Sequence, residues 1–182
     1  DQLLSCSQDG TIRLWSLNNG QQIKQFNGHE EGVYGLCKID KSVFVSSGDD
    51  KSLKFWNMES GLCIHTIEKA HSDMIWSLLY SATNQVLISA SYDNTIKVWD
   101  LSTGEVEKCT LKFTINNPFN TECWSLAFLD GENDGSKVLV GDAGNLFIVD
   151  LKTGTCIKKV KEIYSERVWK LAIVAGDTSN KI

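Results

Sequence analysis

The sequence predicts an all-β protein in which a four-stranded antiparallel unit is repeated about four times. Three observations predict this fold. A segment of eight residues recurs along the chain, short β-branched and apolar segments stand between the copies, and no stretch of eleven residues carries a helical apolar stripe. Because one such sheet cannot bury both of its faces, the units are expected to stack on one another.

The recurring segment ends in tryptophan in its first three copies. Residues 8–15 (QDGTIRLW) return as 49–56 (DDKSLKFW) and as 92–99 (YDNTIKVW), and a weaker copy covers 142–150. Each copy is followed by a turn that contains glycine. Spacings of about 40 to 50 residues suit one supersecondary unit per repeat.

The strands are predicted from apolar and β-branched segments that end at polar turns. Val43–Ser46 and Val86–Ser89 are clear examples. The strand count is sufficient for four units of four strands. In order along the chain, the expected elements are three opening strands (3–7, 11–17, 21–26), three complete units (32–69, 74–114, 122–161) and a last strand (167–174).

On these residues the chain resembles the WD-repeat (WD40) β-propeller family. Gly28–His29 precedes one unit and Trp99–Asp100 closes a strand, as in the repeat signature of that family. The resemblance covers essentially the whole chain and implies a WD40-type β-propeller with four four-stranded antiparallel blades. The implied blades are 1–27 with 164–176, then 28–69, 70–117 and 118–163.

The resemblance also implies a hydrogen-bonded tetrad of His, Ser, Asp and Trp in each blade. A buried indole N–H needs an acceptor, a hydroxyl can accept and donate, and an imidazole can link that hydroxyl to a carboxylate. The first blade keeps only Ser5, Asp9 and Trp15, with Tyr164 at the histidine position. The fourth has lost all four residues, so apolar packing alone is expected to support it. The complete tetrads are His29, Ser46, Asp50 and Trp56, and His71, Ser89, Asp93 and Trp99.

A Ser–His–Asp set could also be read as a hydrolase triad. Here it occurs twice at the same strand positions, and each serine lies inside a strand rather than on an exposed elbow. Both sets are therefore predicted to be structural, and the protein is not expected to be an enzyme. His65, the remaining histidine, falls in an outer strand. The cysteines form no C-x-x-C pair and no metal-ligand spacing with histidine, so neither a metal nor another cofactor is expected.

Composition excludes several classes of partner. The formal net charge of −5 argues against nucleic acid, and the apolar segments are too short to span a membrane. Six cysteines without a glycosylation sequon favour a reducing intracellular compartment, cytoplasmic or nuclear. The chain begins at Asp1 without methionine and is expected to be a piece of something longer.

Three arrangements of the blades are compatible with the strand count. The chain is part of a larger ring, it closes on itself with four blades, or two copies join into one ring. In each case the strand 167–174 is expected to pair with the edge of strand 3–7, in its own chain, in a second copy or through a continuation, because exposed strand edges are avoided.

Four aromatic residues are predicted to share one inner-strand position near the top opening of the channel, one in each blade. They are interpreted as a platform for a partner, with Arg167 at the rim and Phe119 in a long loop over 112–121. The alternative is that these rings only pack near the axis. An acidic insertion over 130–137 is expected on the opposite face. The four are Tyr34, Trp76, Trp124 and Trp169.

The resulting hypothesis is a non-catalytic scaffold or adaptor that presents its top face to a peptide or a partner protein. The alternative is a fixed structural subunit of a large multiprotein assembly that binds through its flanks. Further blades are expected from the same longer chain or from a second copy.

Overall fold

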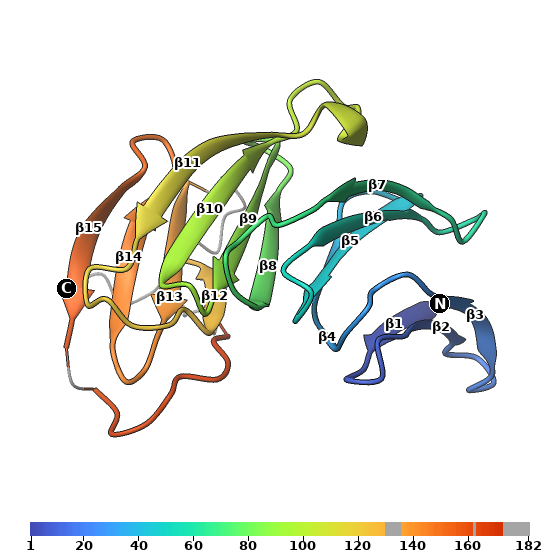
Figure 1. The fold of residues 1–182 in the computed structure, drawn as a ribbon, viewed down its shortest axis with the longest axis horizontal. Helices are drawn as coiled ribbons and strands as arrows, with labels where there is room; N and C mark the ends of the chain where they lie inside the picture. The colour runs from blue at the N-terminus through green and yellow to red at the C-terminus, as the bar shows by residue number, and fades with distance from the viewer. Residues whose placement is uncertain (130–135, 162, 173–182) are drawn as a thin grey trace, which may run out of the picture.

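A computed structural model of the 182-residue chain describes residues 1–129, 136–161 and 163–172. Over these residues the chain forms four antiparallel sheets that follow one another around an arc (Figure 1). Each sheet is one blade, and the blades are numbered here in chain order. The all-β propeller fold predicted from the sequence is confirmed.

The strands of every blade follow chain order from the inside of the arc outward. The first blade has three strands and the others have four. The 3-10 helix η1 (Val106–Lys108) lies in the connection between β10 and β11. The strands are β1 (Gln2–Cys6), β2 (Ile12–Ser16) and β3 (Gln22–Phe26); β4 (Val33–Lys38), β5 (Val43–Gly48), β6 (Leu53–Asn57) and β7 (Cys63–Ile67); β8 (Ile75–Ser81), β9 (Val86–Ser91), β10 (Thr95–Asp100) and β11 (Thr110–Asn116); and β12 (Ser125–Phe128), β13 (Lys137–Gly141), β14 (Leu146–Asp150) and β15 (Thr155–Val160).

The outer hairpin of each blade is irregular at the same point. The pairing register shifts just before Trp15, Trp56 and Trp99, and before Val149 in the fourth blade. A bulge of this kind bends the strand and re-aims the side chain beside it. The repeated segment of the sequence therefore encodes a repeated distortion as well as a repeated strand.

The hydrophobic core lies between neighbouring blades. Ile12 and Phe26 of the first blade pack on Trp56 of the second in one cluster. A second cluster joins Phe55 to Trp99, and a third joins Val98 of the third blade to strands of the fourth. Stacking thus covers the sheet faces that a single blade leaves open.

The strand predicted over 167–174 is not formed in its described part, residues 167–172. This part of the prediction is wrong, and the reason is that these residues have no hydrogen-bonded ladder beside them. They pack instead on the fourth blade: the Val168 N–H donates to the Asp142 carbonyl at 2.9 Å, and the Ser125 hydroxyl donates to the Val168 carbonyl at 2.9 Å. Residues 173–174 of the predicted strand lie outside the described residues, as does most of the predicted 130–137 insertion.

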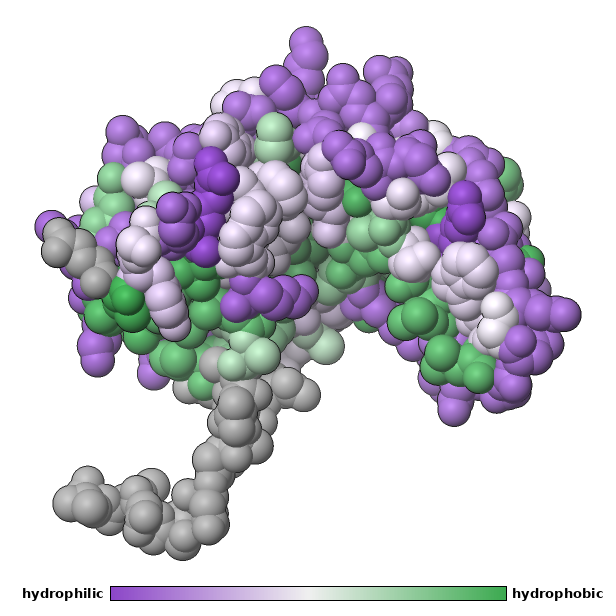
Figure 2. All heavy atoms as spheres, turned by 90° about the horizontal axis from the view of Figure 1, so that it is seen from below, coloured by the Kyte–Doolittle hydropathy of each residue, from purple (hydrophilic) through white to green (hydrophobic). Residues whose placement is uncertain are grey.

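Strand β1 has a hydrogen-bonded neighbour on one side, β2. Beside it lies an open groove of about 830 Å³, lined by apolar side chains such as Leu4 and Leu36 and by the charged Lys38 and Lys41. Leu3 and Leu17 are about half exposed there, at 51% and 58%. Figure 2 shows apolar side chains on both sides of the hollow between the two ends of the arc. Pairing of this edge with a second copy or a continuation of the chain stays a prediction.

Among the described residues, no helix has the length and apolar character needed to cross a membrane.

Candidate partner-binding face and the structural tetrads

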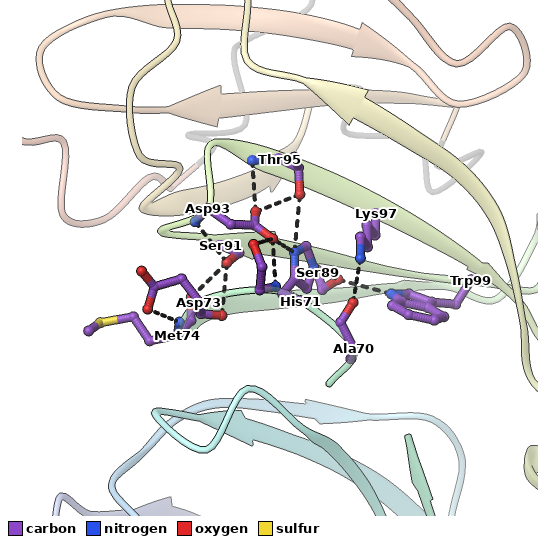
Figure 3. A network of polar contacts seen from close by, with 11 residues as sticks. Ala70, His71, Asp73, Met74, Ser89, Ser91, Asp93, Thr95, Lys97 and Trp99 are labelled. Atoms are coloured by element: carbon purple, nitrogen blue, oxygen red, sulfur yellow. Dashed lines mark hydrogen bonds and ion pairs between the residues drawn. The ribbon is translucent and has the colours of Figure 1, made fainter. Parts of the chain in front are cut away.

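The third blade contains a complete hydrogen-bonded tetrad (Figure 3). The His71 imidazole lies 2.9 Å from an Asp93 carboxylate oxygen through Nδ1 and 2.7 Å from the Ser89 hydroxyl through Nε2. The Trp99 indole N–H donates to the same hydroxyl at 2.9 Å. Thr95 and the backbone of Ser72 also donate to Asp93. The network links the loop between β7 and β8, which carries His71, to β10, the third strand of the blade.

The second blade repeats this arrangement. His29 lies 2.7 Å from Asp50 through Nδ1 and 2.6 Å from Ser46 through Nε2, and the Trp56 indole donates to Ser46 at 2.7 Å. Ser46 and Ser89 have no exposed surface. A serine that meets no solvent cannot attack a substrate, so the geometry favours the structural interpretation of both sets.

The first blade keeps a partial set. The Trp15 indole donates to Ser5 at 2.8 Å, and Asp9 accepts hydrogen bonds from Thr11. Tyr164, predicted to stand at the histidine position, lies against the fourth blade instead. Its backbone N–H donates to the Gly144 carbonyl, and its side chain is exposed.

The fourth blade was expected to be supported by apolar packing alone, and that expectation is wrong. Asp142 is fully buried and accepts hydrogen bonds from Asn117 at 3.0 Å and from Thr121 at 2.8 Å. Its second oxygen accepts from the backbone and side chain of Asn145. This network ties the loop before β12 to the turn after β13, as the tetrads do, with different residue types. The available signal in the sequence was that Asp142 occupies the repeat position one residue before the position of Asp93.

The tetrads change the ionisation of their members. Burial opposes ionisation of Asp50, but hydrogen bonds from His29 and Ser52 outweigh it and lower its pKa to about 2. The same balance, through His71 and Thr95, holds the pKa of Asp93 well below its ordinary value. Burial lowers the pKa of His71 despite the adjacent carboxylate.

These shifts predict a protein that loses stability in acid. A carboxylate with a depressed native pKa stabilises the fold above its unfolded pKa of 3.8, and that contribution is lost as pH falls toward the native value. His71 acts in the same direction below its unfolded pKa of 6.5, because the native state resists protonation. We expect urea midpoints to decline from about pH 6.5 and to fall more steeply below about pH 4. The D50N/D93N variant should show a smaller fall below about pH 4, and equal slopes would contradict this origin.

The four predicted aromatic residues form one cluster on the inside of the arc. Tyr34 stacks on Trp76 with ring centroids 4.4 Å apart, and Trp76 lies 4.6 Å from Trp124. Trp169 completes the cluster, 5.0 Å from Trp124 and 6.2 Å from Trp76. The rings come from β4, from β8, from the residue before β12 and from the C-terminal segment, and are hereafter called the aromatic cluster.

The rings of the aromatic cluster differ in exposure. Trp169 is 62% exposed, Trp124 is 6% exposed, and Tyr34 and Trp76 are half-buried. The cluster borders a cavity of about 200 Å³, which Lys170 also lines. Trp124 is therefore packed, whereas the Trp169 side chain is exposed, and the role of the cluster in partner binding stays a prediction.

The structure places Arg167 beside the aromatic cluster and Phe119 elsewhere. The Arg167 guanidinium lies 4.8 Å from the Trp124 ring centroid. The Phe119 ring contacts Phe147 and the Lys161 ammonium group, and it joins the core between the third and fourth blades.

Sequence reasoning missed two neighbours of the aromatic cluster. Asp49 accepts a hydrogen bond from the Tyr34 hydroxyl at 2.8 Å, and Tyr92 contacts Trp124 edge to face at 5.7 Å. Both residues stand at the position after the second strand of their blades, in the repeated segment. The available signal in the sequence was that Asp49 and Tyr92 occupy the same position of the repeated segment.

Within the described part of the chain, no group of three or more potential ligands could hold a metal ion. All six cysteines are free thiols. Burial raises the pKa of Cys37 to about 11 and that of Cys109 to about 12. Such thiols are protonated at neutral pH and are poor nucleophiles.

Comparison with known proteins assigns the family. The model of the "WD domain, G-beta repeat" matches residues 1–16, 20–57 and 61–100, more than half of the chain. The chain belongs to the WD-repeat family. Proteins of this family generally bind other proteins and are generally non-catalytic.

Curated relatives of the chain are WD-repeat proteins with different names. "Nuclear distribution protein PAC1" of Arthroderma otae is 31% identical over 135 residues, covering 69% of this chain and 29% of the relative. "WD repeat domain-containing protein 83 homolog" of Dictyostelium discoideum is 32% identical over 57% of this chain and 32% of its own length. "Mitochondrial division protein 1" of Eremothecium gossypii is 29% identical over 137 residues, which cover 69% of this chain and 19% of the relative. The chain therefore spans a third or less of the length of these three relatives.

Proposed function

We propose that this protein is a non-catalytic scaffold or adaptor that presents the aromatic cluster to an extended segment of a partner protein. The observation that carries the proposal is the convergence of four rings on the inside of the arc, with Trp169 62% exposed at its surface. Aromatic side chains supply large contact area at low entropic cost and are enriched among binding hot spots.

Packing alone accounts poorly for Trp169. A ring that buries little of its surface contributes little to the core. In the first three blades, moreover, the indole that donates to the tetrad serine already comes from Trp15, Trp56 and Trp99. The cysteine composition supports a reducing compartment, the cytoplasm or the nucleus, as the place of action. The acidic net charge supports a protein rather than a nucleic acid as the partner.

The second candidate is a fixed subunit of a larger assembly that binds through its flanks. It is favoured by the open edge of β1 and by the groove beside it, where the apolar side chains of Leu3 and Leu17 are exposed. Further blades, from a longer chain or a second copy, would cover this edge.

Selection from a random peptide display library, with counter-selection against Trp169→Ala, tests the first proposal. Selected synthetic peptides should lose affinity by about thirtyfold or more when Trp169 or Trp76 is replaced by alanine. Leu62→Ala is the matched control, because Leu62 is 66% exposed in the turn between the outer strands β6 and β7, and its replacement should leave affinity unchanged. Absence of any Trp169-dependent peptide would contradict the proposal.

A further inference from the structure

Two buried indole N–H groups in the aromatic cluster have no hydrogen-bond partner among the described residues. They are the Nε1 groups of Trp76 and Trp124. Buried polar groups are paired in the great majority of cases, and leaving one unpaired costs about 1–3 kcal/mol. The other three tryptophans with buried or half-buried indoles, Trp15, Trp56 and Trp99, each donate to a serine.

These two indoles lie where a ligand can enter. Trp76 and Trp124 line the cavity of about 200 Å³, and their ring centroids are 4.6 Å apart. Trp169, the exposed ring, packs edge-on against Trp76 and at a tilt against Trp124, and it lines the same cavity. A carboxylate has two oxygens and can accept two such hydrogen bonds.

The charges around the cavity distinguish its two ends. Arg167 lies over Trp124, Lys170 lines the cavity, and neither forms an ion pair within the described ranges. The carboxylate in contact with the cluster, Asp49, lies at the other end and already accepts a hydrogen bond from Tyr34. The cavity and its border therefore offer two cations without an ion pair among the described residues, and two N–H donors without a hydrogen bond.

We propose that the partner segment inserts an aspartate or glutamate side chain beside Trp124, where its carboxylate accepts from the Trp76 and Trp124 indoles and is paired by Arg167 and Lys170. This inference rests on the proposed function and specifies the ligand group. A cationic side chain is disfavoured because Arg167 already occupies the face of Trp124. A phosphate is disfavoured because recognition of its double charge uses several converging arginines, and the chain contains only Arg13 and Arg167.

The test uses the Trp169-dependent peptides described above. In each peptide the acidic residues are replaced one at a time by the corresponding amide, by lysine or by phosphoserine, and affinity is measured by fluorescence anisotropy. One Glu→Gln or Asp→Asn change should weaken binding by about tenfold or more. In ¹⁵N-labelled protein the Nε1–H resonances of Trp76 and Trp124 should shift downfield with the acidic peptide and less with its amide.

Protein variants assign the effect to the proposed site. Arg167→Gln should abolish the preference for the acidic peptide over its amide, measured as the ratio of the two affinities. Arg13→Gln is the matched control, since it removes the other arginine, on β2, and should keep the preference. Thermal unfolding verifies that both variants fold.

The outcomes separate this inference from the proposed function. Trp169-dependent peptides that bind equally well as amides, or better with lysine or phosphoserine, would overturn the carboxylate inference and leave the scaffold proposal standing. Failure to obtain any Trp169-dependent peptide would overturn both.

Discussion

Replacing Trp99 by alanine is expected to lower the free energy of unfolding by about 3–5 kcal/mol. The side chain is 4% exposed and lies in the core cluster shared by the second and third blades. Its removal opens a cavity and deprives Ser89 of the donor that completes the tetrad with His71 and Asp93. Urea unfolding followed by circular dichroism measures the loss.

Two variants separate the contributions to this loss. Trp99→Phe retains much of the volume and removes the indole N–H, so it should cost about 1–2 kcal/mol. Trp15→Ala removes the equivalent residue from the first blade, where the indole is half-buried and no histidine completes the set, and should cost less than Trp99→Ala. Equal losses at Trp15 and Trp99 would show that tetrad completion contributes nothing.

The blades and both tetrads could be predicted from the sequence because their determinants are local and repeated. The segment 92–99 specifies a turn, a strand and a bulge before Trp99, and the same pattern specifies the same structure in 49–56. Local preference and global packing agree there, which is the condition for a reliable inference from residues to fold.

Residues 167–172 could not be predicted correctly because a strand requires a neighbour as well as a favourable sequence. Their apolar composition suits a strand, and Val168 makes the inter-blade backbone hydrogen bond that Val33 and Cys123 make at the equivalent position. No ladder beside them completes the strand. The polar network of Asp142 escaped prediction for a related reason, since its partners are brought together by the tertiary packing of one loop and one turn.

The composition of the aromatic cluster could be predicted, whereas its internal packing could not. Equivalent positions on successive inner strands place four rings at one height, which repeat spacing alone indicates. The angle between blades decides whether those rings contact one another, and side-chain direction decides that Phe119 packs on Phe147 instead. Neither quantity is encoded in the spacing of the repeat.

Gly48→Ala is expected to lower the free energy of unfolding by about 3 kcal/mol. Gly48 closes β5 opposite Val33, and a Cβ at this position would overlap the carbonyl oxygen of Gly32 and lie 2.9 Å from its carbonyl carbon. Both are backbone atoms, so no rotamer change relieves the overlap and the pair β4–β5 must separate locally. That movement would disturb the hydrogen bond from the Asp49 N–H to Gly32 and the position of Tyr34 in the aromatic cluster. Urea unfolding gives the stability, and binding of a Trp169-dependent peptide reports the cluster.

Gly104→Ala is the matched control for this prediction. A Cβ at Gly104 meets no atom within 4 Å, and its φ of +74° leaves only the strain of a left-handed residue, about 1 kcal/mol. Gly48 has no positive φ, so its loss is steric and is expected to exceed the backbone strain measured at Gly104. If Gly48→Ala costs no more than Gly104→Ala, the contact between β4 and β5 is not closed at this point as described. If it costs more and also weakens peptide binding, the stacking of Tyr34 on Trp76 depends on the exact approach of these two inner strands.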